Sequence, residues 1–257
     1  MALNETAISE KIIDSYQQKL KSVLDLDVAI VGAGPSGLAA AAILAREGKK
    51  VAVFEKRMST GGGIWAGGMM FNEVIIQESA LRILDDFGVP YRDQGEGMYS
   101  VDAVALASGL TFRAVCAGAA VMNLIQAEDL MMREDRVTGI VINWTTTGMS
   151  KLTIDPLVIR CKIACDATGH EADLTQLLVS KGIPLNTPSG KIEGEKAMWA
   201  EDAEQEVVKN TGEVFPGLYV MGMTANAVHG GHRMGAVFGG MLLSGEKAAV
   251  EILEKLG

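Results

Sequence analysis

The chain has 257 residues, of which 48% are hydrophobic and 21% charged, and its formal net charge is −9. This acidic balance argues against a nucleic-acid-binding surface, which needs clustered lysine and arginine side chains to neutralise phosphates. The apolar content is enough for a folded core, but no apolar run approaches the roughly eighteen residues of a membrane helix. Because the N-terminus also carries no apolar signal segment, the sequence predicts a cytoplasmic protein that binds neither nucleic acid nor membranes.

The first 55 residues predict a helix followed by a strand–helix–strand unit. Apolar residues recur at helical spacing over residues 5–24, within a polar N-terminal extension of residues 1–26. Residues 27–31 predict a buried strand, residues 36–47 a helix and residues 50–55 a second strand. This order is that of a βαβ unit.

The remaining sequence predicts further strands and helices, with no Pro/Gly-rich linker that would divide it. Helices are expected over residues 73–87, 117–124, 173–181 and 235–256, and strands over 127–133, 136–144, 157–167 and 217–223. Residues 99–112 resemble two strands around a turn, and residues 191–209 form a less certain excursion. We therefore expect residues 1–257 to form a single elaborated dinucleotide-binding domain, with residues 1–26 as a helical extension.

A glycine-rich segment, Gly32-Ala33-Gly34-Pro35-Ser36-Gly37, connects the first strand to its helix. Gly32 permits the tight turn, Gly34 lets a pyrophosphate approach the backbone, and Gly37 allows close packing of helix on strand. The N-terminus of the helix offers unpaired N–H groups to a diphosphate. Glu55 ends the second strand, where its carboxylate can accept hydrogen bonds from ribose hydroxyls and would repel a 2′-phosphate. The unit therefore predicts a site for NAD or FAD rather than NADP.

A second glycine cluster, residues 61–68, follows Glu55 closely, after Lys56 and Arg57. We expect it to wrap the diphosphate or the distal ribose. The alternative is a flexible connector, but the apolar residues Ile64 and Trp65 argue against a solvated linker.

Several segments together resemble the thiamine thiazole synthases, relatives of the two-dinucleotide-domain flavoproteins that consume NAD rather than a flavin. The segments that carry the resemblance are residues 32–37, 55–56, 61–68, 153–156, 166–170, 233–235 and 238–245. The match covers nearly the whole chain. It implies an α/β, Rossmann-like dinucleotide-binding fold of the two-dinucleotide-domain flavoprotein type (GR2-like), with a mixed sheet and additional β elements.

The resemblance implies a role in thiamine biosynthesis. The family splits nicotinamide from NAD, condenses the opened ADP-ribose with glycine and adds sulfur, which gives an ADP-thiazole carboxylate. Fungal and plant members take the sulfur from a cysteine, but Thr153 occupies that position here, and a hydroxyl has no sulfur to donate. Cys161 and Cys165 fall in a predicted buried strand and do not hold the motif position. The implied branch is the prokaryotic one, which uses Fe(II) and free sulfide over many turnovers.

The resemblance also assigns roles to individual residues. It implies that Asp155 and His170 are the iron ligands, contributed across a subunit boundary in a homo-octamer, and that Arg233 clamps the glycine carboxylate. From the residues alone, a turn at Asp155 and a helix cap at His170 are favoured over metal ligation. Together with Asp155 and His170, Thr153 completes the implied catalytic set. The residues implied to contact the dinucleotide are Gly32, Gly34, Ser36, Gly37, Glu55, Lys56, Gly63, Ala127 and Met223.

Other functions stay open at this point. An FAD-dependent oxidoreductase of the same fold would share the glycine loop and would be yellow. A non-catalytic NAD-binding protein, or a sugar-bisphosphate isomerase, would also bind a phosphorylated ligand. The roles of His229 and His232, which flank a Gly-Gly pair, are not assigned.

Overall fold

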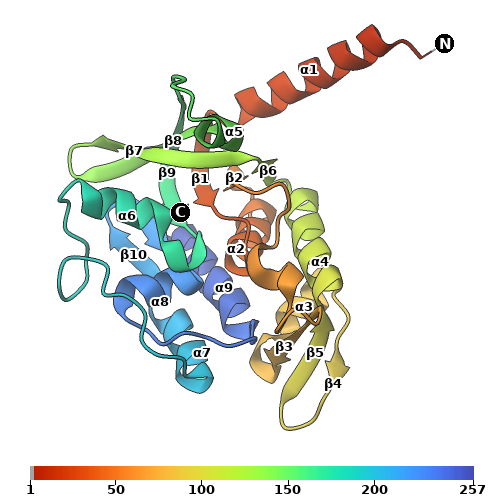
Figure 1. The fold of residues 1–257 in the computed structure, drawn as a ribbon, viewed down its shortest axis with the longest axis vertical. Helices are drawn as coiled ribbons and strands as arrows, with labels where there is room; N and C mark the ends of the chain where they lie inside the picture. The colour runs from red at the N-terminus through yellow and green to blue at the C-terminus, as the bar shows by residue number, and fades with distance from the viewer. Residues whose placement is uncertain (1–2) are drawn as a thin grey trace.

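The structure is a computed structural model that describes residues 3–257, so residues 1–2 of the predicted N-terminal extension lie outside the described residues. A mixed eight-stranded sheet forms its centre (Figure 1). The strands are β1 (Asp25–Val31), β2 (Val51–Glu55), β6 (Ala120–Asn123), β7 (Ile125–Arg133), β8 (Arg136–Trp144), β9 (Leu157–Asp166), β10 (Gly212–Phe215) and β11 (Leu218–Val220).

The parallel part of the sheet has the order β11-β9-β1-β2-β6. Strand β10 pairs antiparallel with β11, and the β7–β8 hairpin joins the sheet where β8 pairs antiparallel with β9. The chain therefore leaves β1 for β2 and β6 on one side and returns on the other side as β9 and β11. This arrangement confirms the predicted Rossmann-like α/β fold with a mixed sheet and added β elements.

Alternate side chains of the central strands enter two separate cores. Val28 and Ile30 face the helices α2 (Pro35–Arg46), α4 (Ala103–Cys116) and α9 (Gly239–Leu256). Ala29 and Val31 face the opposite side, where the β7–β8 hairpin and α6 (Asp173–Ser180) cover the sheet. Both sides of the sheet are thus buried, which is the reason that the central strands are continuously apolar.

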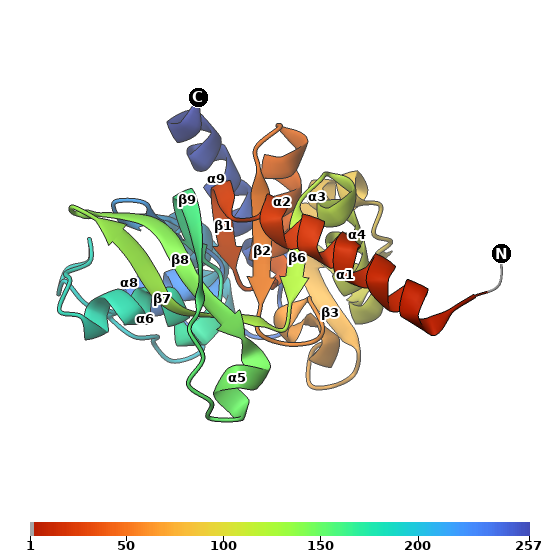
Figure 2. The same ribbon diagram turned by 90° about the horizontal axis from the view of Figure 1, so that it is seen from above.

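Helix α1 (Glu5–Ser22) projects from the body as an arm (Figures 1 and 2). Asn4 caps it, because the side-chain Oδ1 accepts a hydrogen bond from the backbone N–H of Ala7 at 3.1 Å. The helix was predicted over residues 5–24 and is confirmed, although it has no buried residue. Within residues 3–257, no helix has the length and apolar character needed to cross a bilayer.

A separate three-stranded antiparallel sheet lies beside α4 and is built from β3 (Glu73–Gln77), β4 (Arg92–Asp93) and β5 (Met98–Asp102). The helix predicted over residues 73–87 is wrong in its first part, because Val74 and Ile76 are buried on one face of β3. A short 3-10 turn, η2 (Glu78–Ala80), then leads into α3 (Leu81–Phe87).

Two further predictions are wrong in the same region. The strands expected over residues 99–112 end at Asp102, whose Oδ1 accepts a hydrogen bond from Ala105 N at 2.8 Å and so caps α4. The helix expected over residues 117–124 is instead β6, which extends the parallel sheet beyond β2.

The C-terminal third is close to prediction except in its short elements. Strand β9 and helix α6 lie where they were expected, and the excursion over residues 191–209 contains α7 (Ala200–Lys209). An unpredicted helix, α8 (Met223–His229), follows the last strand, because Gly222 turns the chain with a φ of +65°. Short elements complete the fold, namely η1 (Gly62–Ala66), α5 (Thr145–Met149) and η3 (Gly169–Glu171).

Candidate active site

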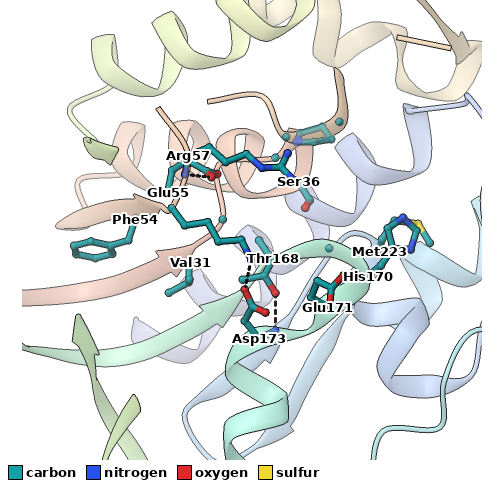
Figure 3. Close-up of a pocket in the computed structure, with 18 of the residues that line it drawn as sticks. Val31, Ser36, Phe54, Glu55, Arg57, Thr168, His170, Glu171, Asp173 and Met223 are labelled. Carbon is teal, nitrogen blue, oxygen red and sulfur yellow. Dashed lines mark hydrogen bonds and ion pairs between the residues drawn. The ribbon is translucent and has the colours of Figure 1, made fainter. Parts of the chain in front are cut away.

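A cavity of about 690 Å³ opens at the carboxyl ends of β1, β2 and β9 (Figure 3). Val31, Glu55 and Ala167, which lie at or next to the ends of these strands, all line it. In open α/β sheets, ligands bind in the crevice at the carboxyl edge, where successive connections leave in opposite directions. This volume is in the range of small-molecule and cofactor sites.

The first glycine loop forms one wall of the cavity. Gly32 has a φ of +102°, and a Cβ there would overlap the carbonyl oxygen of Ala167. Gly34 lines the cavity. Gly37 does not line it, and a Cβ there would overlap the carbonyl oxygen of Gly32 at the start of α2. The tight turn at Gly32 and the close packing at Gly37 are as predicted, whereas the approach of a pyrophosphate to Gly34 stays a prediction.

Ser36 is held at the N-terminal end of α2 by contacts from distant segments. Its side chain lines the cavity and is 4% exposed. A Cβ on Gly222 would overlap its hydroxyl oxygen, and a Cβ on Gly245 would overlap its carbonyl oxygen. Gly222, after β11, and Gly245, in helix α9, therefore both pack closely against Ser36 of the glycine loop.

Glu55 is buried and supports the same loop. Its Oε2 accepts a hydrogen bond from Ala33 N at 2.9 Å, and its Oε1 accepts one from Arg57 N at 2.8 Å. Each carboxylate oxygen has a second lone pair, so ribose hydroxyls can be accepted as well. Glu55 therefore lines the cavity at the end of β2, and its contact with ribose hydroxyls stays a prediction.

The two basic residues that follow Glu55 in the sequence, Lys56 and Arg57, both line the cavity. Lys56 forms an ion pair with Asp173 at 2.9 Å, and both residues line the cavity. Arg57 also lines it, and its side chain extends toward Ser36 in Figure 3. The family motif predicts a ligand contact for Lys56 but not for Arg57, although a basic pair directly after the acidic residue is a signal for both.

The second glycine cluster packs directly on the first. Gly61 N donates a hydrogen bond to Ala33 O at 2.7 Å, and a Cβ on Gly62 would lie 3.1 Å from Gly34 Cα. Gly62 and Gly63 line the cavity, and Ile64 is fully buried beneath it. These contacts are those of a structured wall and not of a flexible connector.

The far wall comes from β7. Gln126, Ala127 and Glu128 line the cavity, and Gln126 Nε2 donates to Glu128 Oε1 at 3.1 Å. The buried Asn143 donates to Glu128 Oε2 at 3.3 Å and to the carbonyl oxygen of Ile154 at 3.2 Å. Asn143 therefore connects this wall to the loop that follows α5.

A buried aspartate shapes the turn after β9. Asp166 is fully buried and accepts four hydrogen bonds, from the backbone N–H and hydroxyl groups of Thr168 and Thr175. Burial raises the pKa of the Asp166 carboxyl above its usual value, and the four donors oppose that shift. This network fixes the turn that presents Thr168, Gly169 and His170 to the cavity.

His170 lines the cavity, and its ring Nδ1 lies 2.7 and 2.9 Å from the two carboxylate oxygens of Glu195. Its side chain does not cap α6, so the alternative role as a helix cap is wrong. Arg233 lies on the same side, with its Nε 3.9 Å from Glu195 Oε2. Glu195 thus brings together two of the predicted site residues.

The Thi4 family model matches residues 9–238 of the chain. The chain belongs to the Thi4 family. It is 53% identical to the thiamine thiazole synthase of Desulfosudis oleivorans over 258 residues, with 100% of both chains covered. It is 52% identical to the thiamine thiazole synthase of Pyrococcus furiosus over 255 residues, with 99% of each chain covered. The crystal structure of Thermovibrio ammonificans THI4 superposes with a TM-score of 0.96 at 52% identity, covering 100% of this chain and 99% of that one.

Membership in the Thi4 family makes the chain an enzyme of thiamine biosynthesis that carries out thiazole synthesis. The family uses NAD as a substrate together with a metal. This agrees with the family that the sequence motifs indicated.

The Thi4 chain brings most of the predicted ligand residues to one cavity, but besides Gly37 three of them do not line it. Thr153 and Asp155 are exposed in the loop between α5 and β9, and neither lines the cavity. Arg233 is beside the cavity but outside its lining, which includes the next residues, Met234 and Gly235. Within residues 3–257, no group of three or more His, Cys, Asp and Glu side chains is placed to hold a metal ion.

The other two histidines of this Thi4 protein do not line the cavity. Burial lowers the pKa of His229. His232 Nδ1 lies 3.0 Å from Glu206 Oε2, and its ring meets that of Trp199 edge-on at 5.5 Å. Among the remaining lining residues, Met223 is 6% exposed, at the start of α8.

Proposed function

We propose that this Thi4 enzyme makes an ADP-thiazole carboxylate from NAD, glycine and free sulfide with Fe(II), and that it turns over repeatedly. The proposed chain of events splits nicotinamide from NAD, condenses the ADP-ribose portion with glycine, and takes the sulfur of the thiazole from solution.

The observation that carries the sulfide requirement is the position of the three cysteines. None of them lines the cavity. Cys161 and Cys165 are buried in β9, and burial raises the pKa of Cys161 to about 12 and that of Cys165 well above its usual value. Because the thiolate is the reactive form, these thiols are inert as well as inaccessible. Thr153 has no sulfur, so the chain offers no donor at the site.

The walls of the cavity suit the ADP portion of NAD. The glycine loop and the N-terminus of α2 present backbone N–H groups to a diphosphate, and Arg57 adds a positive charge that extends toward Ser36. Glu55 accepts the ribose hydroxyls and disfavours a 2′-phosphate. We place the adenine against the backbone of Ala127 and the distal ribose near Gly63 and Met223.

The donor atoms around His170 suit Fe(II), which accepts imidazole and carboxylate ligands and leaves positions open for substrate. Since Nδ1 of His170 contacts Glu195, Nε2 is the nitrogen that would bind the metal. Asp155 is exposed on a projecting loop and would supply the carboxylate to the cavity of a second subunit. When bound, the iron supplies Lewis acidity to the substrate. Arg233 would bind the glycine carboxylate in two-point fashion.

The test is an anaerobic assay of the full chain with Fe(II), NAD, glycine and sulfide, followed by mass spectrometry. We expect an adenylated thiazole, more nicotinamide than protein chains, and an unchanged intact protein mass. Omission of sulfide should stop thiazole formation. A product formed without sulfide, together with a protein that has lost the mass of a thiol, would overturn the proposed sulfur source.

Two variants test the proposed metal ligands and their origin in different subunits. His170→Ala and Asp155→Ala should each abolish thiazole formation and keep NAD binding, since neither residue belongs to the glycine loop. If the ligands come from different subunits of a homo-oligomer, which family resemblance suggests is an octamer, co-expression of the two variants should restore part of the activity. No recovery in the mixed oligomer would argue for ligands from one chain.

A further inference from the structure

Glu195 is the one carboxylate that contacts both His170 and Arg233 among residues 3–257. Its Oε1 and Oε2 lie 2.7 and 2.9 Å from Nδ1 of His170, and Oε2 lies 3.9 Å from Nε of Arg233. The Glu195 side chain is 15% exposed, compared with 49% for His170 and 58% for Arg233. The Glu195 carboxylate is therefore the most buried member of the cluster, and the side chains of His170 and Arg233 are more exposed to solvent.

The backbone on both sides of Glu195 is fixed against α8 and the segment that follows it. Gly194 N donates to Ala227 O at 3.0 Å. Lys196 N donates to Gly231 O at 2.9 Å, and Lys196 O accepts from Arg233 N at 3.3 Å. The segment that carries Glu195 thus has a register set by hydrogen bonds on either side of it, although it forms no regular strand or helix.

The backbone next to His170 is also fixed by hydrogen bonds, here to Thr224 of α8. Gly169 N donates to the hydroxyl of Thr224 at 2.9 Å, and that hydroxyl donates to Gly169 O at 3.0 Å. The buried Asp166 network fixes the residues before it. The contact between His170 and Glu195 therefore joins two anchored segments. In Figure 3, His170 lies on the opposite side of the cavity from Phe54.

We propose that Glu195 is a positioning residue that fixes the tautomer and orientation of His170 and holds Arg233 beside it. A carboxylate can only accept hydrogen bonds, so the neutral ring must carry its proton on Nδ1 and leave the lone pair on Nε2. That lone pair is the one a metal needs, and carboxylate partners of this kind orient histidine ligands in metal sites. The inference rests on the proposed role of His170 as a metal ligand.

The tautomer can be measured without metal or substrate. The chain has three histidines, so solid-state NMR of the metal-free protein with ¹⁵N-labelled histidine gives few ring signals to assign, whatever the size of the oligomer. At alkaline pH, where imidazoles are neutral, we expect His170 in wild type to be protonated on Nδ1. Glu195→Gln should give a mixture, because an amide can either accept from Nδ1–H or donate to the Nδ1 lone pair.

The matched control is Glu206→Gln. Glu206 makes the same kind of contact with His232, at 3.0 Å, but that histidine does not line the cavity. The control should change the ring signals of His232 and leave those of His170 as they are. The wild-type spectrum needs no variant, so the inference stays testable even if Glu195→Gln does not fold.

Fe(II) titration of the full chain under anaerobic conditions gives the second measurement. Glu195→Gln should weaken Fe(II) binding by about 10- to 100-fold, whereas Glu206→Gln should not, and NAD affinity should be unchanged in both. A wild-type His170 that carries its proton on Nε2 overturns the inference, as does an unchanged Fe(II) affinity in Glu195→Gln. His170→Ala separates this failure from that of the proposed function: if His170→Ala binds Fe(II) like wild type, the metal assignment itself is wrong.

Discussion

Glu55→Gln tests how the nucleotide site is built, because this substitution removes one charge with almost no change of shape. The carboxylate accepts backbone N–H groups from both Ala33 and Arg57, at 2.9 and 2.8 Å. A glutamine offers one oxygen and one NH₂ group, so one of the two buried N–H donors would face another donor. An unsatisfied buried group costs about 1–3 kcal/mol, and we expect the free energy of unfolding to fall by that amount.

The same substitution should weaken NAD binding. A hydrogen bond to a charged acceptor is stronger than one to a neutral acceptor by about 1 kcal/mol, which is about fivefold in affinity for each ribose hydroxyl. With two hydroxyls, NAD affinity should fall by about 30-fold if the contributions add. NADP should lose less, because the charge that repels its 2′-phosphate is also removed, so the ratio of NAD to NADP affinity should fall.

Isothermal titration with NAD and NADP, and urea unfolding of the free protein, measure these effects. Glu47→Gln is the matched control, since Glu47 is exposed at the other end of α2 and should change neither quantity. If Glu55→Gln kept the wild-type ratio of NAD to NADP affinity, the ribose would not be held by this carboxylate. An unchanged urea midpoint would refute the supporting role of the carboxylate in the glycine loop.

Two further substitutions test packing and charge elsewhere. Gly245→Ala places a methyl group against the carbonyl oxygen of Ser36, a backbone atom that cannot rotate away. Urea unfolding should show a free energy of unfolding that is lower by about 1–3 kcal/mol. Gly235→Ala is the control, because the space around Gly235 is open. Burial raises the pKa of Glu204, whose Oε1 has no hydrogen-bond partner among the described residues. The folded state therefore holds this proton more tightly than the unfolded state, so the contribution of Glu204 to stability is largest at low pH and is lost as the pH rises through the raised pKa. In urea unfolding between about pH 4 and pH 7, Glu204→Gln should lack this fall and gain stability relative to wild type as the pH rises; a constant difference across that range would contradict the assignment.

The parts of the fold that the sequence predicted are those with strong local signals. The βαβ unit combines a buried strand, a glycine loop, a helix and a terminal carboxylate within about thirty residues, and each is readable without knowing its partners. The strand β9 was predicted because its second part, residues 163–166, is continuously buried, and its first part alternates buried and exposed residues as a strand does.

Errors arose where the structure depends on distant partners. Apolar residues in the segment 73–87 fit a helix as well as a strand, and β3 forms only because it pairs with β5 more than twenty residues later. The cap residue Asp102 was a local signal for the start of α4, but the β-branched and aromatic residues near it favoured strands. Short segments of this kind are decided by tertiary pairing.

The site shows the same division. Glycines, Glu55 and His170 were found because they belong to contiguous motifs. Glu195 was missed because it lies in an irregular segment, which long-range hydrogen bonds of Gly194 and Lys196 bring to His170. No local pattern in the sequence specifies that contact.

The packing of Ser36 also sets the order in which the site can be completed during synthesis. The glycine loop is among the first parts of the chain to be made, whereas Gly222 and Gly245, which close its back, are among the last. Strand β1 likewise lacks its neighbour β9 until residue 166 has been added. A nascent chain that stops before β11 thus displays the loop without its supports. NAD should therefore stabilise finished chains selectively, because a ligand stabilises only the state that binds it.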